Sequence, residues 1–360
     1  MEAVLTPSDT KEWMDDMLLN QGFFVISIDF ELYWGLRDIM PPDRYKRELL
    51  REREIIPRVL RLFREQGIHA TWATVGLLFL RHREEMNVYL PSRLPAYADR
   101  ALSPYPALFS QMIGENETQD PSHYGSSLIR MIAETPYQRI GTHTFSHYYC
   151  KEAGQDAADF TADLQAAVRV AERDEFALES IVFPRNQLRE DYLQELGKAG
   201  IRSYRGNPDH PLYRDGYSRH DPLPKRLLRL LDTYLNLSGY HTYVPGTELL
   251  NPKDYGREGD IPPLNLPASQ FFRSYARSLR LLEALRFRRI RNAMTYAAKH
   301  RRIYHLWWHP YNLADPEGRN FKLLERIVSH YKHLEITYGM RSAGMEELCD
   351  WIMGQEEEGN

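Results

Sequence analysis

The sequence predicts an α/β fold built on a mainly parallel sheet or barrel. Short apolar runs of β type alternate with longer amphipathic segments along the 360 residues, of which 42% are hydrophobic. This alternation is typical of βαβ units, whose strands run parallel and whose helices cover the sheet. Polar residues also follow several apolar runs directly, as expected where α/β proteins build their sites at the carboxyl ends of strands.

The predicted strands can be followed in chain order, with helical segments between them. Gly200 is a good helix C-cap, so a helix ends there and the next strand begins. A helix and a short βα pair follow the last clear strand. The expected strands are FFVISI (Phe23–Ile28), IHATWATV (Ile68–Val75), QRIGTH (Gln138–His143), ESIVFP (Glu179–Pro184), IRSY after Gly200, and RIYHLWWH (Arg302–His309).

One domain over residues 23–353 accounts for this pattern, and a chain of this length can bury a large core. Residues 1–22 are expected to form an N-terminal extension, and residues 354–360 a disordered acidic tail. Two insertions interrupt the alternation, near 86–124 and 241–300, the first rich in Pro, Ser and Tyr and the second in Pro and Gly up to Pro267. Long loops in compact domains are often functional.

Composition excludes several classes of protein. A net charge of −4 argues against a general nucleic-acid binder. Two cysteines, Cys150 and Cys349, make a disulfide framework unexpected. The first twenty residues carry acids where a signal peptide needs basic residues, and no apolar run is long enough to span a membrane. We therefore expect a cytoplasmic protein without a transmembrane segment.

The candidate functional residues share one position, the carboxyl end of a predicted strand. In barrels and open parallel sheets these ends meet on one face, so the side chains are expected to lie together. Scattered structural polar residues would have no reason to share that face. The residues are Asp29, Glu31, His143, Arg185 and His309.

The segment HTFSH, His143–His147, predicts a metal site. If the chain turns into a helix there, the i,i+4 spacing places both imidazoles on one side. A carboxylate from the first strand would complete a two-His, one-carboxylate ligand set with an open position. Cys150 continues the series, but a free cysteine is more often a small buried hydrophobe.

Asp29 and Glu31 stand at i and i+2, so in extended chain both point the same way. Two acids on one face repel each other unless a cation or a proton separates them. One acid on a metal and the other beside an arginine, for which Arg185 is the candidate, would remove the repulsion. The alternative is a strand end whose acids are solvated or cap a helix. His309 could equally be a core histidine, although Pro310 ends the strand and favours a position at the rim.

Four motifs in this order resemble those of the polysaccharide deacetylases, carbohydrate esterase family 4, whose fold is the NodB-homology domain. HTFSH matches the family's His-Ser/Thr-x-x-His motif, SIDFE resembles its first motif, FPRNQ its arginine-proline motif and LWWH its Leu-x-x-His motif. The second acid comes one residue late and is Glu, and Pro and Arg are exchanged in FPRNQ. The fourth motif is not located; Asp232 in RLLDTYLN is a guess.

The resemblance implies a distorted (β/α) barrel, a divalent metal, usually zinc, and hydrolysis of N-acetyl groups on amino sugars. On this interpretation Asp29 is the base, Arg185 orients it and His309 is the acid. The metal ligands would be Glu31, His143 and His147, although Asp29 could itself reach the metal. Trp34, Trp307 and Trp308 would offer flat faces to a sugar ring.

Two other functions remain open from the sequence. Divergent members of this fold hydrolyse cyclic ureides such as allantoin, and a catalytically inactive relic could bind carbohydrate. The sugar could also be free, nucleotide-linked or lipid-linked. The strongly basic segment Phe271–Arg302 is either a helix packed on the barrel with a solvated basic face, or a contact for an anionic substrate group or an acidic membrane surface.

Overall fold

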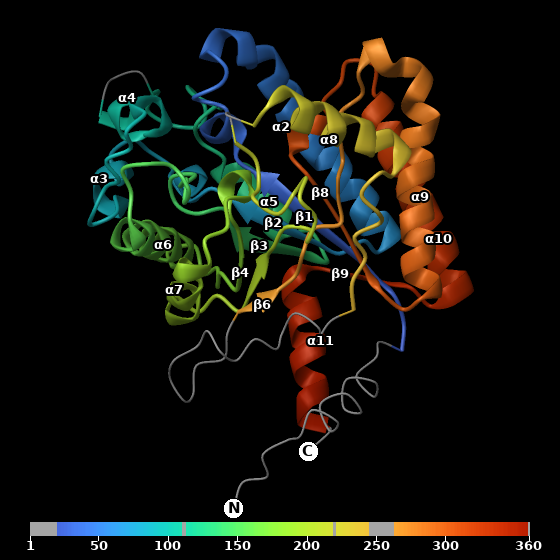
Figure 1. Cartoon of the computed structure of the whole chain (residues 1–360). Helices are drawn as coiled ribbons and strands as arrows, with labels where there is room; N and C mark the ends of the chain where they lie inside the picture. Colours follow the sequence, from blue (N-terminus) through green and yellow to red (C-terminus); the bar gives the residue numbers. More distant parts are fainter. Residues whose placement is uncertain (1–19, 110–112, 219–220, 245–262, 359–360) are drawn as a thin grey trace, which may run out of the picture.

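The computed structural model describes residues 20–109, 113–218, 221–244 and 263–358. They form a parallel sheet curled into a barrel, with helices packed around it (Figure 1). The strand order is β6-β5-β4-β3-β2-β1-β8-β7, and β9 pairs with the start of β1. The nine strands in these residues are β1 (Phe23–Phe30), β2 (Ala70–Thr74), β3 (Gln138–Thr142), β4 (Ser180–Val182), β5 (Ser203–Arg205), β6 (Leu264–Asn265), β7 (Gln270–Phe271), β8 (Ile303–Trp308) and β9 (Arg341–Ala343).

The barrel closes through one bent segment that contains both β6 and β7. The first half pairs with β5, where the amide of Leu266 donates to the carbonyl of Tyr204 at 2.9 Å. The second half pairs with β8, where the amide of Ser269 donates to the carbonyl of His305 at 2.8 Å. Pro267, which cannot donate to either neighbour, lies between the halves. The expected distorted barrel is therefore confirmed.

Every residue of β1 is buried. This fits a strand covered by side chains on one face and by helices on the other, and it explains the continuous apolar run of the sequence. α8 (Leu223–Leu235) lies across the top of the barrel in Figure 1. The other helices around the barrel are α2 (Pro42–Gln66), α5 (Ser126–Ala133), α6 (Ala157–Glu172), α7 (Leu193–Lys198), α9 (Glu283–Lys299) and α10 (Arg319–Tyr338).

The lower end of the barrel is closed by α11 (Met345–Glu358), which stands below the strands in Figure 1. Leu348 and Ile352 of this helix pack with Phe23 and Val25 in a second apolar core. The helix continues to Glu358, where the sequence predicts a disordered tail from residue 354; the last two residues lie outside the described part. Residues 1–19 of the expected N-terminal extension also lie outside the described part.

The first insertion contains the short helices α3 (Glu85–Tyr89) and α4 (Tyr105–Phe109). In the second, residues 245–262 lie outside the described part. The basic segment that follows forms α9, which packs against α8, α10 and β8. Its Arg286 and Arg289 are buried and paired with carboxylates, so this part of the basic segment packs on the barrel and its arginines do not form a solvated face. Among the described helices, none is long and apolar enough to cross a bilayer.

Candidate active site

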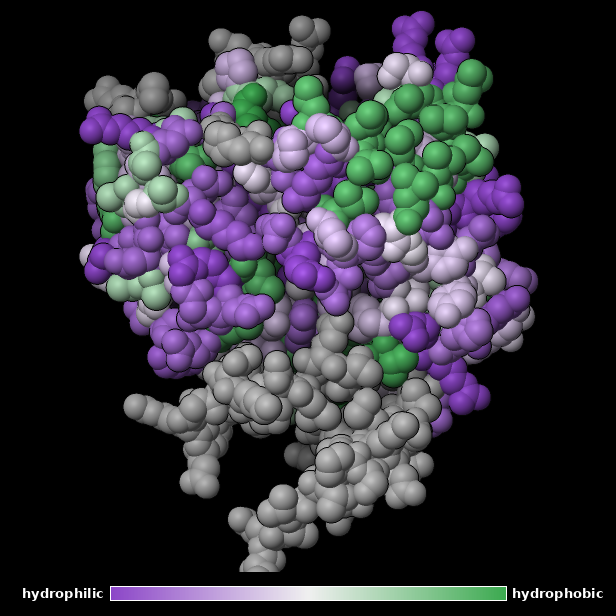
Figure 2. Space-filling model, in the orientation of Figure 1, coloured by the Kyte–Doolittle hydropathy of each residue, from purple (hydrophilic) through white to green (hydrophobic). Residues whose placement is uncertain are grey.

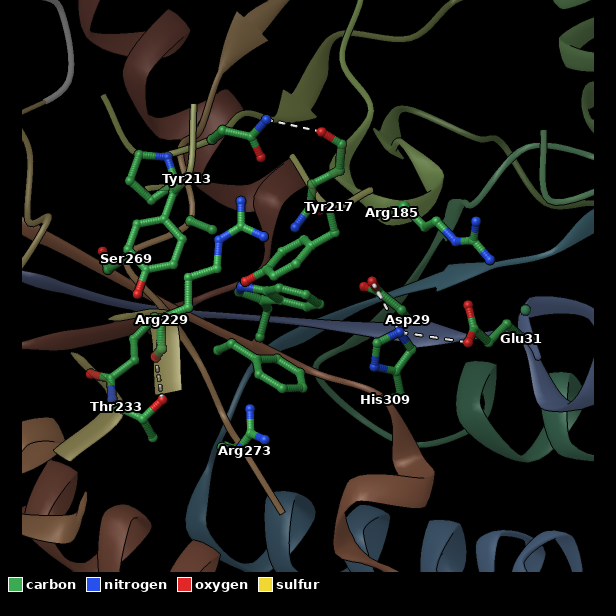
Figure 3. A pocket seen from close by; sticks show the side chains of 18 of the residues that line it. Asp29, Glu31, Arg185, Tyr213, Tyr217, Arg229, Thr233, Ser269, Arg273 and His309 are labelled. Carbon is green, nitrogen blue, oxygen red and sulfur yellow. Dashed lines mark hydrogen bonds and ion pairs between the residues drawn. The ribbon is translucent and has the colours of Figure 1, made fainter. Parts of the chain in front are cut away.

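A cavity of about 370 Å³ opens at the carboxyl ends of the strands, the face that the sequence predicts (Figure 3). Asp29 and Glu31 both line it, the first from the end of β1 and the second from the turn into the next 3₁₀ helix. His147, Arg185 and His309 line it as well. Residues that are distant in the sequence are thus brought to one site.

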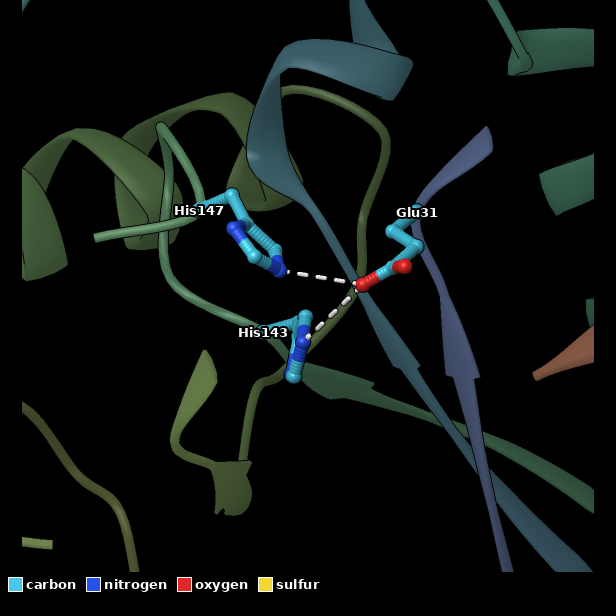
Figure 4. A group of neighbouring side chains, drawn as sticks. All are labelled: Glu31, His143 and His147. Carbon is cyan, nitrogen blue, oxygen red and sulfur yellow. Dashed lines mark hydrogen bonds and ion pairs between the residues drawn. The ribbon is translucent and has the colours of Figure 1, made fainter. Parts of the chain in front are cut away.

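Glu31, His143 and His147 form the group that could hold a metal (Figure 4). Oε2 of Glu31 lies 3.0 Å from Nε2 of His147 and 3.5 Å from Nε2 of His143. All three side chains are buried, and their ligand atoms lie within 4.8 Å of one another. Two imidazoles and one carboxylate are a ligand set of catalytic zinc sites.

The imidazole nitrogens of this group have lone pairs that could bind a metal. Nδ1 of His143 is 2.8 Å from the carbonyl oxygen of Val182, to which it donates, and this fixes the tautomer with a lone pair on Nε2. That Nε2 is buried and has no hydrogen-bond partner among the described residues. Burial lowers the pKa of His147 to about 4 despite the opposing charge of Glu31, so a lone pair is available at neutral pH. The residues therefore fit a divalent metal.

Glu31 is ionised in this environment. Burial alone would raise its pKa, but the charge of His309, followed by the interactions of the carboxylate with His147 and His143, outweighs burial. Together they hold the pKa of Glu31 well below its ordinary value. The carboxylate is thus ready to bind a cation.

The chain does not turn into a helix at HTFSH, which is the condition for the i,i+4 argument. The segment is a loop, in which Thr144 and His147 have positive φ values of 63° and 56°. Asp163 of α6 holds the loop by accepting hydrogen bonds from the amides of Phe145 and Ser146. The imidazoles converge because of this left-handed backbone, with ring centroids 5.0 Å apart, and helical spacing plays no part.

Asp29 is paired with Arg205. Nη1 and Nη2 of the guanidinium lie 2.7 and 2.8 Å from the two carboxylate oxygens. Arg205 also donates to Ser27 and to Asn186, and its guanidinium lies 4.2 Å from the centre of the Trp307 ring. Burial would raise the pKa of Asp29, but the charge of Arg205 leads the effects that lower it below its ordinary value.

Arg185, the expected partner of Asp29, does not contact it. Its guanidinium forms an ion pair with Asp38 and lies 4.4 Å from the centre of the Tyr149 ring. The backbone of Arg185 is left-handed, with φ 55°, and its side chain lines the cavity. Arg205 takes the place that the sequence assigns to Arg185.

His309 lies at the rim, as the sequence predicts. Its Nε2 is 3.8 Å from Oδ2 of Asp29 and 3.6 Å from Oε1 of Glu31 (Figure 3). Nδ1 is 3.2 Å from Oδ1 of Asn312, and the ring stacks on Tyr311. The imidazole is therefore oriented with Nε2 toward the two acids.

Of the three tryptophans expected at the substrate, only Trp307 lines the cavity. Side chains alternate along β8, so Trp308 points to the other face, where it is fully buried beside Phe272. Trp34 is also buried, and its indole donates to the carbonyl of His123. The expected sugar contacts of Trp34 and Trp308 are wrong.

Asp232, the guess for the missing motif, does not reach the acids of the site. It is buried on α8 and pairs with Arg289 at 2.8 Å while accepting from the hydroxyl of Tyr213. Both partners line the cavity, so Asp232 supports its wall. Arg205 is the residue that sequence reasoning missed, although it ends β5 and thus satisfies the strand-end criterion applied to the others.

The chain matches no family model and no curated protein. It is similar to a Mycobacterium smegmatis structure assigned as a polysaccharide deacetylase, with TM-score 0.57, 14% identity and 93% and 92% of the two chains covered. PuuE allantoinase follows with TM-score 0.54, 11% identity and 92% and 90% coverage. A Pseudomonas aeruginosa PAO1 structure, also assigned as a polysaccharide deacetylase, has TM-score 0.52, 11% identity and the same coverage. The chain therefore has the fold of the polysaccharide deacetylases, the family that its four motifs resemble.

Proposed function

We propose that this protein is a metal-dependent hydrolase that removes the N-acetyl group from an amino sugar. One observation carries the proposal. The buried group of Glu31, His143 and His147 and the pair of Asp29 with Arg205 meet at one cavity. Nε2 of His309 stands less than 4 Å from both acids.

The metal we propose is zinc, held by Glu31, His143 and His147. When bound, it would polarise the acetyl carbonyl and acidify water at the site. Glu31 supplies the charge of the ligand set, and the hydrogen bond of His143 to Val182 fixes the orientation of one imidazole. Asp29 keeps Arg205 as its partner and is thus free of the ligand set.

Two protons must move in amide hydrolysis, and the site has one residue for each. Asp29 accepts the proton of the attacking water, and Arg205 keeps this carboxylate ionised beforehand. His309, as imidazolium, donates a proton from Nε2 to the nitrogen of the breaking C–N bond. One water is consumed, and the products are acetate and the amine.

The walls of the cavity favour a sugar joined to an anionic group. Trp307 and Phe271 present aromatic faces, with ring centroids 4.6 Å apart. Half-buried Arg273 also lines the cavity, and within the described residues it forms no ion pair (Figure 3). An unneutralised guanidinium suits a phosphate. We propose a nucleotide-linked or lipid-linked sugar, a biosynthetic intermediate of the cytoplasm.

The test is an assay of the zinc-loaded protein against acetylated nucleotide-linked and lipid-linked sugars, with released acetate as the readout. Acetate release that stops on chelation and returns with zinc is the expected result. Ring opening of allantoin without acetate release from any sugar would replace the proposal by the ureide alternative. A loaded, folded protein that turns over neither class would indicate a binding relic.

A further inference from the structure

The outer face of α8 exposes a group of leucines that no core explains. Leu223 of this helix is 75% exposed, and Leu281, in the 3₁₀ helix η7 (Arg277–Leu282) that leads into α9, is 87% exposed. Figure 2 shows apolar side chains gathered over α8 and the top of α9. We call this group the leucine patch; it consists of Leu223, Leu227, Leu228, Leu235, Leu237 and Leu281. Contiguous apolar surface of this kind marks an interaction site.

The inner face of α8 fixes this display. Arg229 is buried and binds the carbonyls of Leu212 and Gly216 and the carboxylate of Asp221. Asp232, one turn on, is paired with Arg289. The polar side of the helix is thus anchored in the wall of the cavity. The opposite side, which carries the leucines, therefore faces outward.

Unpaired basic residues accompany the leucine patch. Arg226 lies on α8, and Arg277 and Arg280 lie on η7 beside Leu281. All three are exposed, and none forms an ion pair within residues 20–109, 113–218, 221–244 and 263–358. The neighbouring acid Glu283 is already paired with Arg286. The surface therefore combines apolar side chains with uncompensated positive charge.

We infer that the leucine patch and these arginines dock the protein on an anionic lipid membrane. Leucines can enter the acyl boundary of a bilayer while arginines bind lipid phosphates, the combination that holds interfacial helices. Self-association is less suited to this surface, because an isologous contact would bring its arginines close to those of a second copy. Docking goes beyond the proposed function, and it places the cavity wall formed by Arg229 and Thr233 at the lipid surface.

The test is co-sedimentation of the full chain with phosphatidylglycerol–phosphatidylcholine vesicles and with vesicles of phosphatidylcholine alone. Binding to the anionic vesicles that weakens with salt is expected. Leu227→Asp with Leu235→Asp should lower the partition coefficient by at least about tenfold. The matched control, Val88→Asp with Ile336→Asp, changes two exposed residues on other elements, 71% and 84% exposed, and should leave it unchanged.

A second pair of variants tests the contribution of the arginines beside the leucine patch. Arg277→Glu with Arg280→Glu should weaken binding to anionic vesicles by roughly 25-fold or more, about fivefold for each charge removed. Arg61→Glu with Arg64→Glu, on exposed positions of α2, makes the same change in net charge and should have little effect. Circular dichroism and zinc content identify variants that are folded.

Three results would overturn the inference. The first is that folded wild-type protein does not bind anionic vesicles. The second is that the patch variants and the control variants lose binding equally. The third is a wild-type dimer in sedimentation velocity that Leu227→Asp with Leu235→Asp dissociates. Acetate release from a soluble substrate should be unchanged in the patch variants, so docking and catalysis can fail separately.

Discussion

Arg205 holds both carboxylate oxygens of Asp29, at 2.7 and 2.8 Å, from a strand four positions away in the sheet. This bidentate pair separates the roles of the two acids at the end of β1. Asp29 is stabilised as an anion by a fixed organic cation, whereas Glu31 faces two imidazoles. The repulsion that two adjacent acids would suffer is removed without placing both on a metal.

Removing Arg205 should move the pH dependence of catalysis. In Arg205→Gln the pKa of Asp29 rises, because the largest lowering effect is lost while burial remains. The acidic limb of kcat/KM should then shift to higher pH, with zinc content unchanged. Loss of one member of a buried pair also destabilises, by about 3–5 kcal/mol, which the free energy of unfolding will show.

Arg185→Gln is the matched control, because Arg185 contacts Asp38 and leaves Asp29 untouched. Its acidic limb should stay in place. An unshifted limb in a folded Arg205→Gln protein would contradict the assignment of Arg205.

His309→Ala should keep zinc and fold but lose roughly 10²–10⁴-fold in turnover, the usual contribution of general acid catalysis. The steady-state rate of acetate release measures the effect. Tyr311→Phe is the control, since it keeps the ring that stacks on His309 and removes only the hydroxyl. A near-normal rate in zinc-loaded His309→Ala would exclude the role.

Arg273→Gln should raise KM by about 10–100-fold for a phosphate-linked acetylated sugar, the range expected for one charge-assisted hydrogen bond. The value of kcat should change little, because Arg273 is not among the residues proposed to move protons. Arg288→Gln, an exposed position of α9, serves as the control. An equal rise in KM for the free sugar would rule out contact with the anionic group.

The stability of the protein should depend on pH through Glu346, which lies at the end of the barrel opposite the candidate site. Burial raises its pKa above the ordinary value of 4.5, even though the hydroxyls of Thr71 and Ser180 donate to the carboxylate. Stability from this group is full below pH 4.5 and is lost as the pH rises through the raised pKa. Urea unfolding between pH 5 and 8 should show Glu346→Gln gaining stability relative to the wild type, and a constant difference would contradict this.

The fold follows from the sequence because strand runs such as Phe23–Ile28 must be buried on both faces, and only parallel sheets covered by helices do this. The strand-end criterion also found Asp29, Glu31, His143 and His309. Arg205 ends a strand of only three residues, whereas Arg185 in FPRNQ follows a clearer apolar run, so the sequence pattern favours Arg185.

Two further errors have identifiable structural causes. Trp308 follows Trp307 in the sequence, but strand alternation sends the two rings to opposite faces. HTFSH has helical spacing, yet hydrogen bonds to Asp163 and two left-handed residues make it a loop. Such contacts between distant segments have no periodicity in the sequence, so pattern analysis cannot supply them.

The most direct test of the account is the zinc content of two purified variants, measured by elemental analysis. Asp29→Asn should retain about one zinc per chain and lose turnover, because Asp29 belongs to the pair with Arg205. Glu31→Gln should lose zinc, because it removes the only carboxylate within reach of His143 and His147 in the described group. A zinc-free Asp29→Asn protein beside a fully loaded Glu31→Gln protein would contradict the division of roles.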